Sequence, residues 1–189
     1  MHAPTPVGRS RYTRKPMSKS TSRFITNNEL WSQIHDYVAK VQHVSVAVAY
    51  FGEDGANLLP LKRGDNIVVD MSLGAVRQGV TNPRAVRTLM ARGVRVFSRG
   101  SLHAKFIVAG RTLIASSANA SHNSRSLLDE AGIITTDPAA VQRAVSFFEK
   151  LCTEPGGKKY LVSVLMNTGR RGSRRRSRHG VQLRIAHNE

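Results

Sequence analysis

Three stretches of the chain carry apolar residues at the spacing of one helix face, which predicts amphipathic helices. The helices are expected over 29–41, 82–93 and 138–152. Asn27 and Asn28 precede the first, so we expect an asparagine cap there. The second helix has Pro83 at its first position and ends on Gly93, two residue types that favour a helix start and a helix stop.

Short runs of β-branched and other apolar residues lie between and around these helices. They predict buried strands over 43–51, 64–74, 94–98, 105–110, 112–116 and 131–136. Because these strands alternate with helices, the pattern predicts an α/β fold, in which a mixed β-sheet has helices on both faces. We place this domain at residues 23–160.

The net charge of +17 is concentrated at the two ends of the 189 residues. Residues 1–22 hold five basic and no acidic residues, and residues 161–189 hold seven basic and one acidic. Residues 23–160 hold 17 basic and 11 acidic residues, so 11 of the 17 net charges lie in the tails. The first tail is nearly free of apolar residues and is expected to be disordered. The second consists of a short apolar piece followed by an Arg-rich segment.

We expect the Arg-rich segment to bind nucleic acid without sequence preference, because clustered arginines attract polyanions. Its arginines are Arg170, Arg171, Arg174, Arg175, Arg176 and Arg178. On charge alone an anionic membrane surface or an acidic partner stays open, and so does a solvated tail without a specific role.

The compartment is expected to be the cytoplasm. No apolar run is long enough to span a membrane, and no apolar stretch follows the basic N-terminus as it would in a secretory signal. An Arg- and Ser-rich transit peptide stays an alternative. Cys152 is the only cysteine, so neither an intrachain disulfide nor a metal site built mainly from thiolates is expected.

The residues that could carry chemistry gather in the middle of the chain. His103 and Lys105 lie two residues apart at the start of a predicted strand, so their side chains share one face. Asn119 follows the next strand and would return to the neighbourhood of His103 if the two strands pair. An imidazole, a fixed cation and an amide donor suit a phosphoryl group. A carboxylate would orient the imidazole, and Glu130 is the candidate.

This set resembles the signature of the phospholipase D superfamily. The signature is His-x-Lys-x4-Asp, then Gly-Ser-x-Asn, then a later Glu. The chain has His103 and Lys105, then Ser117 and Asn119, then Glu130. The order of helices and strands ahead of the histidine is also similar, and the resemblance covers roughly 27–151.

Two departures from the signature stand out. Gly110 occupies the position of the family Asp, and Ser116 replaces the first Gly of the second segment, which also arrives one residue early. In this family the Asp is generally held to be structural rather than chemical. The departures therefore put the local turn geometry in doubt more than the chemistry, although a degenerate site stays open.

The resemblance implies a metal-independent phosphodiesterase, here an endonuclease that cleaves nucleic acid, with DNA favoured over RNA. His103 would attack phosphorus and form a phosphohistidine, and a second histidine would protonate the leaving oxygen. Lys105, Ser117 and Asn119 would bind the phosphate oxygens, and Glu130 would hold the His103 ring. No metal or other cofactor is implied, because lysines supply the positive charge. The chain has one motif where the chemistry needs two, so a homodimer is implied.

Other classes stay open. Taken singly, the His-Lys pair could be an ordinary strand end, Asn119 a helix cap and Glu130 a solvated acid. The chain could be a catalytically inactive nucleic-acid-binding or structural subunit, with Gly110 as the main support. A lipid-acting phospholipase D would share the motif, but no membrane-inserting segment is visible. A nuclease could act alone or as the cleaving subunit of a larger defence or restriction complex.

Overall fold

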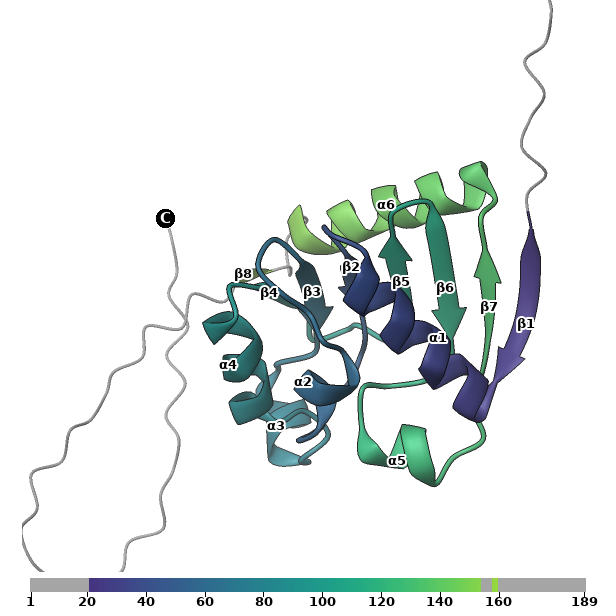
Figure 1. Ribbon diagram of the computed structural model, residues 1–189. Coiled ribbons are helices and arrows are strands. Elements are labelled where there is room, and N and C mark those ends of the chain that lie inside the picture. Colours follow the sequence, from purple (N-terminus) through teal and green to yellow (C-terminus); the bar gives the residue numbers. More distant parts are fainter. Residues whose placement is uncertain (1–20, 154–157, 160–189) are drawn as a thin grey trace, which may run out of the picture.

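The computed structural model describes residues 21–153 and 158–159, so most of the two expected tails lies outside the described part. The described strands form one eight-stranded sheet in the order β1-β7-β6-β5-β2-β3-β4-β8 (Figure 1). The strands are β1 (Ser22–Thr26), β2 (Ser45–Ala47), β3 (Asn66–Val69), β4 (Arg95–Ser98), β5 (Phe106–Ala109), β6 (Thr112–Ser116), β7 (Ala131–Thr135) and β8 (Lys158–Lys159). Strands β2, β3 and β4 are parallel and the other pairs antiparallel, so the prediction of a mixed sheet is confirmed.

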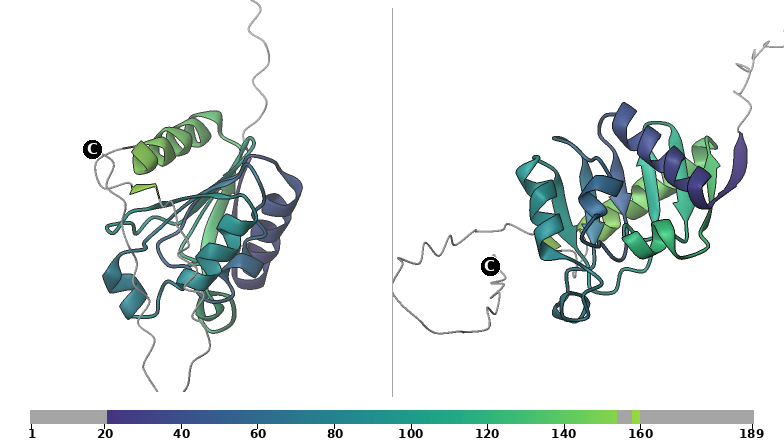
Figure 2. Two further views of the ribbon diagram at one scale, coloured as in Figure 1. Left: turned by 90° about the vertical axis from the view of Figure 1, so that its left-hand side faces the viewer. Right: turned by 60° about the horizontal axis from the view of Figure 1, so that its bottom comes forward.

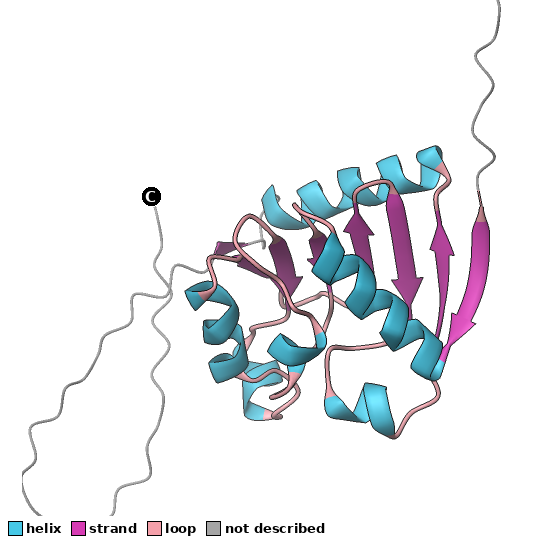
Figure 3. Ribbon diagram, in the orientation of Figure 1, coloured by secondary structure: helices cyan, strands magenta, loops and turns pink. Residues whose placement is uncertain are grey.

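Helices cover both faces of the sheet, as predicted (Figures 2 and 3). The helices are α1 (Asn27–Lys40), α2 (Gly55–Leu58), α3 (Leu73–Arg77), α4 (Pro83–Ala91), α5 (His122–Ser126) and α6 (Pro138–Thr153). Helices α1 and α4 pack on one face of the sheet and form the first hydrophobic core with it. Helix α6 packs on the opposite face and forms the second core. No helix of the described residues is both long and apolar enough to cross a bilayer.

The helix faces that pack on the sheet are the ones the apolar spacing predicts. Leu30, Ile34 and Val38 of α1 are buried in the first core. Phe148 and Leu151 of α6 are buried in the second. Each such side chain contributes about 1.5–3 kcal/mol when fully removed from water, so the cores hold the helices on the sheet.

The N-terminal boundary differs from the prediction. Strand β1 begins at Ser22, inside the segment 1–22 that was expected to be disordered, and pairs along its whole length with β7. The hydroxyls of Ser22 and Thr135 are hydrogen-bonded at 2.8 Å. The strand escapes prediction because it is short, exposed at four of five positions, and continues the polar and basic composition of the tail.

Of the two helix caps predicted from the sequence, one is confirmed and the other is wrong. Asn82 caps α4 as predicted, because its side chain accepts hydrogen bonds from the amides of Arg84 and Ala85. The expected cap of α1 is wrong, since Thr26 holds that position without a side-chain hydrogen bond. Asn27 is the first helical residue, with a φ of 44°, and its side chain bonds elsewhere.

Gly110 lies in the two-residue loop that joins β5 to β6, where Ala109 pairs with Thr112. Its φ is 60°, and Arg111 is not among the residues with a positive φ. A glycine with positive φ at the first loop position matches the type II′ hairpin turn. The residue at this position is therefore determined by the turn, which lies at the end of β5 away from His103.

One end of the sheet collects chain segments from its middle strands. The carboxyl ends of β2, β3 and β4 meet there, together with the start of β5, the end of β6 and the start of β7. Helices α3 and α5 lie just beyond this end (Figure 1). We call it the site end, because open α/β sheets bind ligands outside the carboxyl ends of their parallel strands.

Candidate active site

All five candidate residues lie at the site end. His103 and Lys105 immediately precede β5, Ser117 and Asn119 follow β6, and Glu130 precedes β7. Backbone hydrogen bonds hold these segments in register.

The Ser116 amide donates to the Lys105 carbonyl at 3.1 Å, and the Ser117 amide donates to the Ala131 carbonyl at 2.9 Å. The strand pairing that was expected to bring Asn119 back toward His103 therefore exists.

Lys105 contacts His103 twice. Its Nζ lies 2.8 Å from the His103 carbonyl oxygen and 3.3 Å from His103 Nε2. An ammonium group can only donate, so Nε2 must accept, and the ring proton of the neutral imidazole belongs on Nδ1. His103 is exposed, so a phosphate group could reach its ring from solvent.

The pKa of Lys105 is lower than that of an ordinary lysine. Partial burial at the sheet end lowers the pKa of the Lys105 ammonium group, because leaving water penalises its charged form. The charge of Glu130 acts in the opposite direction and raises the same pKa. The two residues are thus close enough for their charges to interact.

Glu130 is buried at 5% exposure, and its backbone and carboxylate are both held. The Ser117 hydroxyl donates a short hydrogen bond to its carboxylate, and the Ala131 amide donates to the same hydroxyl at 3.1 Å. This hydrogen bond uses the proton of the Ser117 hydroxyl, which therefore cannot donate to a phosphate oxygen at the same time. The expected phosphate contact from Ser117 therefore needs this bond to break.

The expected contact between Glu130 and His103 is not among the hydrogen bonds of the described residues. The ring of His103 contacts Lys105, and the carboxylate of Glu130 contacts Ser117. Strand β6 lies between β5 and β7, and neighbouring strands are about 4.8 Å apart, which places the two segments about 10 Å from each other. Within one chain Glu130 therefore supports Ser117 rather than the imidazole.

Asn119 is oriented by the segment that follows β2. Its Oδ1 accepts a hydrogen bond from the Tyr50 amide at 3.1 Å, and its own amide donates to Ser124 Oγ at 3.1 Å. Oδ1 of the side chain is thus occupied, whereas the side-chain Nδ2 donates no hydrogen bond among the described residues and keeps both of its donors for a ligand. Asn119 is not a helix cap, because Ser121 caps α5.

Asn27 is a site-supporting residue that the sequence pattern missed. Its Oδ1 accepts from the Glu130 amide at 2.8 Å, and its amide donates to the Glu130 carbonyl at 2.9 Å. Its Nδ2 donates to Asp129 at 3.1 Å. The asparagine pair before a helix was a signal, but it points to a local cap and carries no information about a partner 103 residues away.

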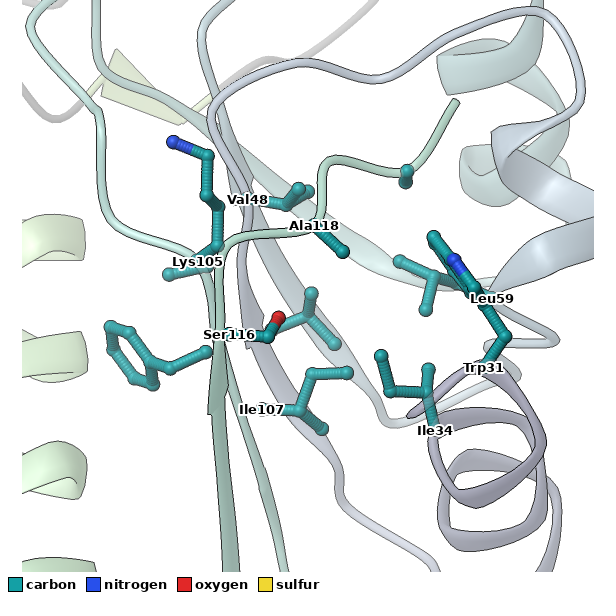
Figure 4. A pocket seen from close by; sticks show the side chains of 12 residues that line it. Trp31, Ile34, Val48, Leu59, Lys105, Ile107, Ser116 and Ala118 are labelled. Atoms are coloured by element: carbon teal, nitrogen blue, oxygen red, sulfur yellow. The ribbon is translucent and has the colours of Figure 1, made fainter. Parts of the chain in front are cut away.

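A small cavity lies behind the site, between α1 and the sheet (Figure 4). Trp31, Ile34 and Ile107 line it, and its volume of about 20 Å³ is the size of a single water. The Lys105 side chain extends away from this cavity, whereas the Ser116 hydroxyl points into it (Figure 4). This cavity is therefore too small to hold a substrate.

The family comparison agrees with this arrangement. Residues 20–152 match the family model described as "Cardiolipin synthase, PLD-like domain". The chain belongs to the phospholipase D-like family. A comparison with curated protein sequences found no match.

Solved phospholipase D-like structures share the fold. NucT from Helicobacter pylori aligns with a TM-score of 0.60 at 14% identity, over 75% of this chain and 100% of its own. Nuc from Salmonella typhimurium, a phospholipase D family member, aligns with a TM-score of 0.56 at 13% identity, over 75% and 99%. Phosphatidylserine synthase from Haemophilus influenzae gives 0.55 at 16%, over 75% of this chain and 40% of its own.

The family position of Gly110 also has a structural explanation. Seven residues separate it from His103, and a strand rises about 3.3 Å per residue, so the two lie roughly 20 Å apart. Gly110 therefore lies in the β5–β6 turn, away from the residues at the site end.

Proposed function

We propose that this phospholipase D-like protein is a metal-independent endonuclease that cleaves nucleic acid. The observation that carries the proposal is the Lys105 contact to His103 Nε2, at the sheet end where Asn119 keeps two free amide donors. The nucleophile and the cation are thus in contact, and the amide donor follows the neighbouring strand β6. The basic tails and the small nuclease-like relatives, which the chain covers almost completely, favour nucleic acid over lipid.

The proposed reaction begins when a phosphate approaches His103. Lys105 exchanges its bond to Nε2 for one to a phosphate oxygen, which frees the lone pair to attack phosphorus. The P–N bond forms as the bond to the leaving oxygen breaks, and a second histidine gives that oxygen a proton. Water then attacks the phosphorus and gives a proton back to the second histidine, and the P–N bond breaks to restore His103. Lys105 and the Asn119 donors stabilise the charge on the phosphate oxygens throughout.

The second histidine would come from a second copy of the chain. The described residues hold one His-Lys motif, and a homodimer with its axis at the site would pair two of them. Exposed apolar residues at this end support the proposal, because Leu127 and Leu128 are 69% and 57% exposed just before Glu130. The same arrangement could bring Glu130 of one copy near the His103 ring of the other.

We further propose that the arginines at 170–178 add sequence-independent affinity, that DNA is preferred to RNA, and that the protein works in the cytoplasm. Whether the dimer acts alone or as the cleaving subunit of a larger complex is open. An inactive nucleic-acid-binding subunit is the main alternative, since the same contacts would hold a phosphate without cleaving it.

The deciding experiment incubates the full chain with labelled DNA, labelled RNA and labelled phospholipid in excess EDTA. Cleavage of a nucleic acid under these conditions is the expected result. Cleavage that appears only after magnesium or manganese is added contradicts the histidine mechanism. Release of a headgroup from phospholipid with intact DNA and RNA would instead favour a lipid-acting enzyme.

A further inference from the structure

Charge is segregated within the described part of the chain. Residues 71–128 contain nine Lys and Arg residues and no Asp or Glu. Residues 21–70 and 129–153 together contain six basic and ten acidic residues. Native surfaces usually intersperse the two signs, so a stretch this uniform creates a positive field over the elements that it forms.

Seven arginines of this stretch are exposed, and four of them lie on helices α3, α4 and α5: Arg77, Arg84, Arg87 and Arg125. The ion pairs of the described residues join Arg23 to Glu29 and Lys40 to Asp36, all outside the stretch. None of the four arginines therefore forms an ion pair with a carboxylate in the described part of the chain. They also occupy short helices with no acidic residue in the first turn, where one would be favourable.

Backbone contacts place Arg84 close to the site. The Asn82 amide, at the cap of α4, donates to the Phe51 carbonyl at 2.7 Å. Phe51 forms a β-bridge with Ala120, the residue after Asn119. Phe51, in the segment that follows β2, therefore contacts both the start of α4, where Arg84 lies, and the residue after Asn119.

Arg125 lies on the other side of Asn119. The Asn119 amide donates to the hydroxyl of Ser124, which is the neighbour of Arg125 on α5. Helix α3, which carries Arg77, and helix α5 both lie at the site end, and α4 begins beside α3 (Figures 1 and 2). The four helix arginines therefore lie on two sides of the site, whereas the exposed Arg111 lies in the β5–β6 turn at the opposite end of the sheet.

We propose that these arginines form a phosphate track for one nucleic-acid strand that crosses the site. Arg77, Arg84 and Arg87 bind phosphates on one side of the scissile group, and Arg125 binds phosphates on the other. The proposal rests on the proposed function and adds to it the path of the substrate. A linear polyanion fits two basic flanks separated by a site better than a single headgroup does.

The test compares two variants of the full chain that each remove two charges. Arg84→Gln with Arg125→Gln removes one arginine from each flank. Arg143→Gln with Lys150→Gln removes two exposed charges from α6, on the other face of the sheet. Binding of a labelled single-stranded DNA is measured at several salt concentrations, together with the cleavage rate as a function of DNA concentration.

The track pair should flatten the slope of log affinity against log salt by about 1.4, since each phosphate contact on a single strand contributes about 0.7. It should also raise KM, while the control pair leaves the slope and KM as in wild type. Equal effects of the two pairs would overturn the track and leave the nuclease intact.

Two other outcomes also count against the track. If the wild type cleaves DNA but the track pair binds it as the wild type does, the track is wrong and the nuclease stands. If the wild type binds neither DNA nor RNA but binds vesicles of anionic phospholipid, and the track pair loses that binding, the surface serves a membrane and the proposed function fails with it. Similar melting temperatures of all variants exclude unfolding, as expected for exposed arginines.

Discussion

The ammonium group of Lys105 is shared between the His103 carbonyl and His103 Nε2, and this sharing makes its charge state central to the site. Burial lowers the pKa of this group, so the charged form is lost at a lower pH than in an ordinary lysine. The cation that stabilises the phosphate is then present at low pH and disappears as the pH rises through the lowered pKa.

The variant Lys105→Arg tests this assignment. A guanidinium does not deprotonate in the accessible range, so the fall in rate on the alkaline side of the wild-type profile should be absent in the variant. The absolute rate should be lower, because arginine does not reproduce both contacts to His103. The measurement is the cleavage rate against pH, normalised to each maximum. If the rates of the wild type and of Lys105→Arg fall over the same alkaline pH range, a group other than Lys105 causes that fall.

Asn27 makes two hydrogen bonds to the backbone of Glu130. Its side-chain Oδ1 accepts from the Glu130 amide, and its own backbone amide donates to the Glu130 carbonyl. In Asn27→Gly the side-chain acceptor disappears, while glycine tolerates the φ of 44° without strain. Leaving the buried Glu130 amide without its partner should cost about 1–3 kcal/mol in unfolding free energy and lower the rate at saturating substrate. Denaturant unfolding and kcat are the two readouts.

Asp129→Ala is the matched control for that variant. It removes only the exposed bond between Asn27 and Asp129 and leaves the bond to Glu130. Its unfolding free energy should change by less than 1 kcal/mol, on the order of an exposed polar contact, and its kcat should stay near wild type. Equal losses in the two variants would mean that Asn27 does not act through Glu130.

Among the elements, prediction succeeds where periodic apolar residues pack directly on the sheet. Helices α1, α4 and α6 and strands β2 to β7 were predicted from such patterns. Strand β1 and helix α3 were missed, because they are short and their residues are mostly exposed. Helix α5 was expected only as a short helix that Asn119 could cap. The roles of Asn27 and Ser124 could not be predicted, since each depends on a partner brought close by the fold.

The candidate site divides in the same way. His103, Lys105 and Asn119 could be placed together from strand pairing alone, because the hairpin β5–β6 is local in the sequence. The expected link from Glu130 to His103 is not among the hydrogen bonds of the described residues, and local spacing could not decide it because it does not contain the strand order. Strand β6 separates the two segments, and the carboxylate bonds Ser117 instead.

The β6–β7 pair, which aligns Ser117 with Glu130, depends on Gly132. A Cβ added at Gly132 would lie 2.8 Å from the Ala115 carbonyl oxygen and 3.1 Å from Leu30 Cδ1. In Gly132→Ala the backbone of β6 must therefore move, since a carbonyl of the ladder cannot rotate away. We expect a loss of about 1–3 kcal/mol in unfolding free energy and a reduced kcat. A variant with wild-type stability and kcat would show that the strands accommodate the methyl group.

At the scale of the whole molecule, the proposed mechanism requires a second copy of the chain. We expect a dimer in sedimentation experiments at micromolar concentration. The double variant Leu127→Ser, Leu128→Ser should shift the protein to monomer and reduce cleavage in parallel, because both leucines lie exposed next to the site. Phe24→Ser changes a residue of similar exposure on the edge strand β1 and should leave both unchanged. Full activity in a monomeric variant would contradict the shared site.

The central claim is that His103 is the nucleophile of a working phosphodiesterase. The most direct measurement is the rate of nucleic-acid cleavage at saturating substrate in excess EDTA for wild type and His103→Ala. His122→Ala serves as control, since His122 is an exposed histidine at the first position of α5 outside the motif. The account predicts that His103→Ala loses several orders of magnitude in rate while it still binds nucleic acid, and that His122→Ala stays close to wild type. A His103→Ala protein that cleaves as fast as the wild type would contradict the account.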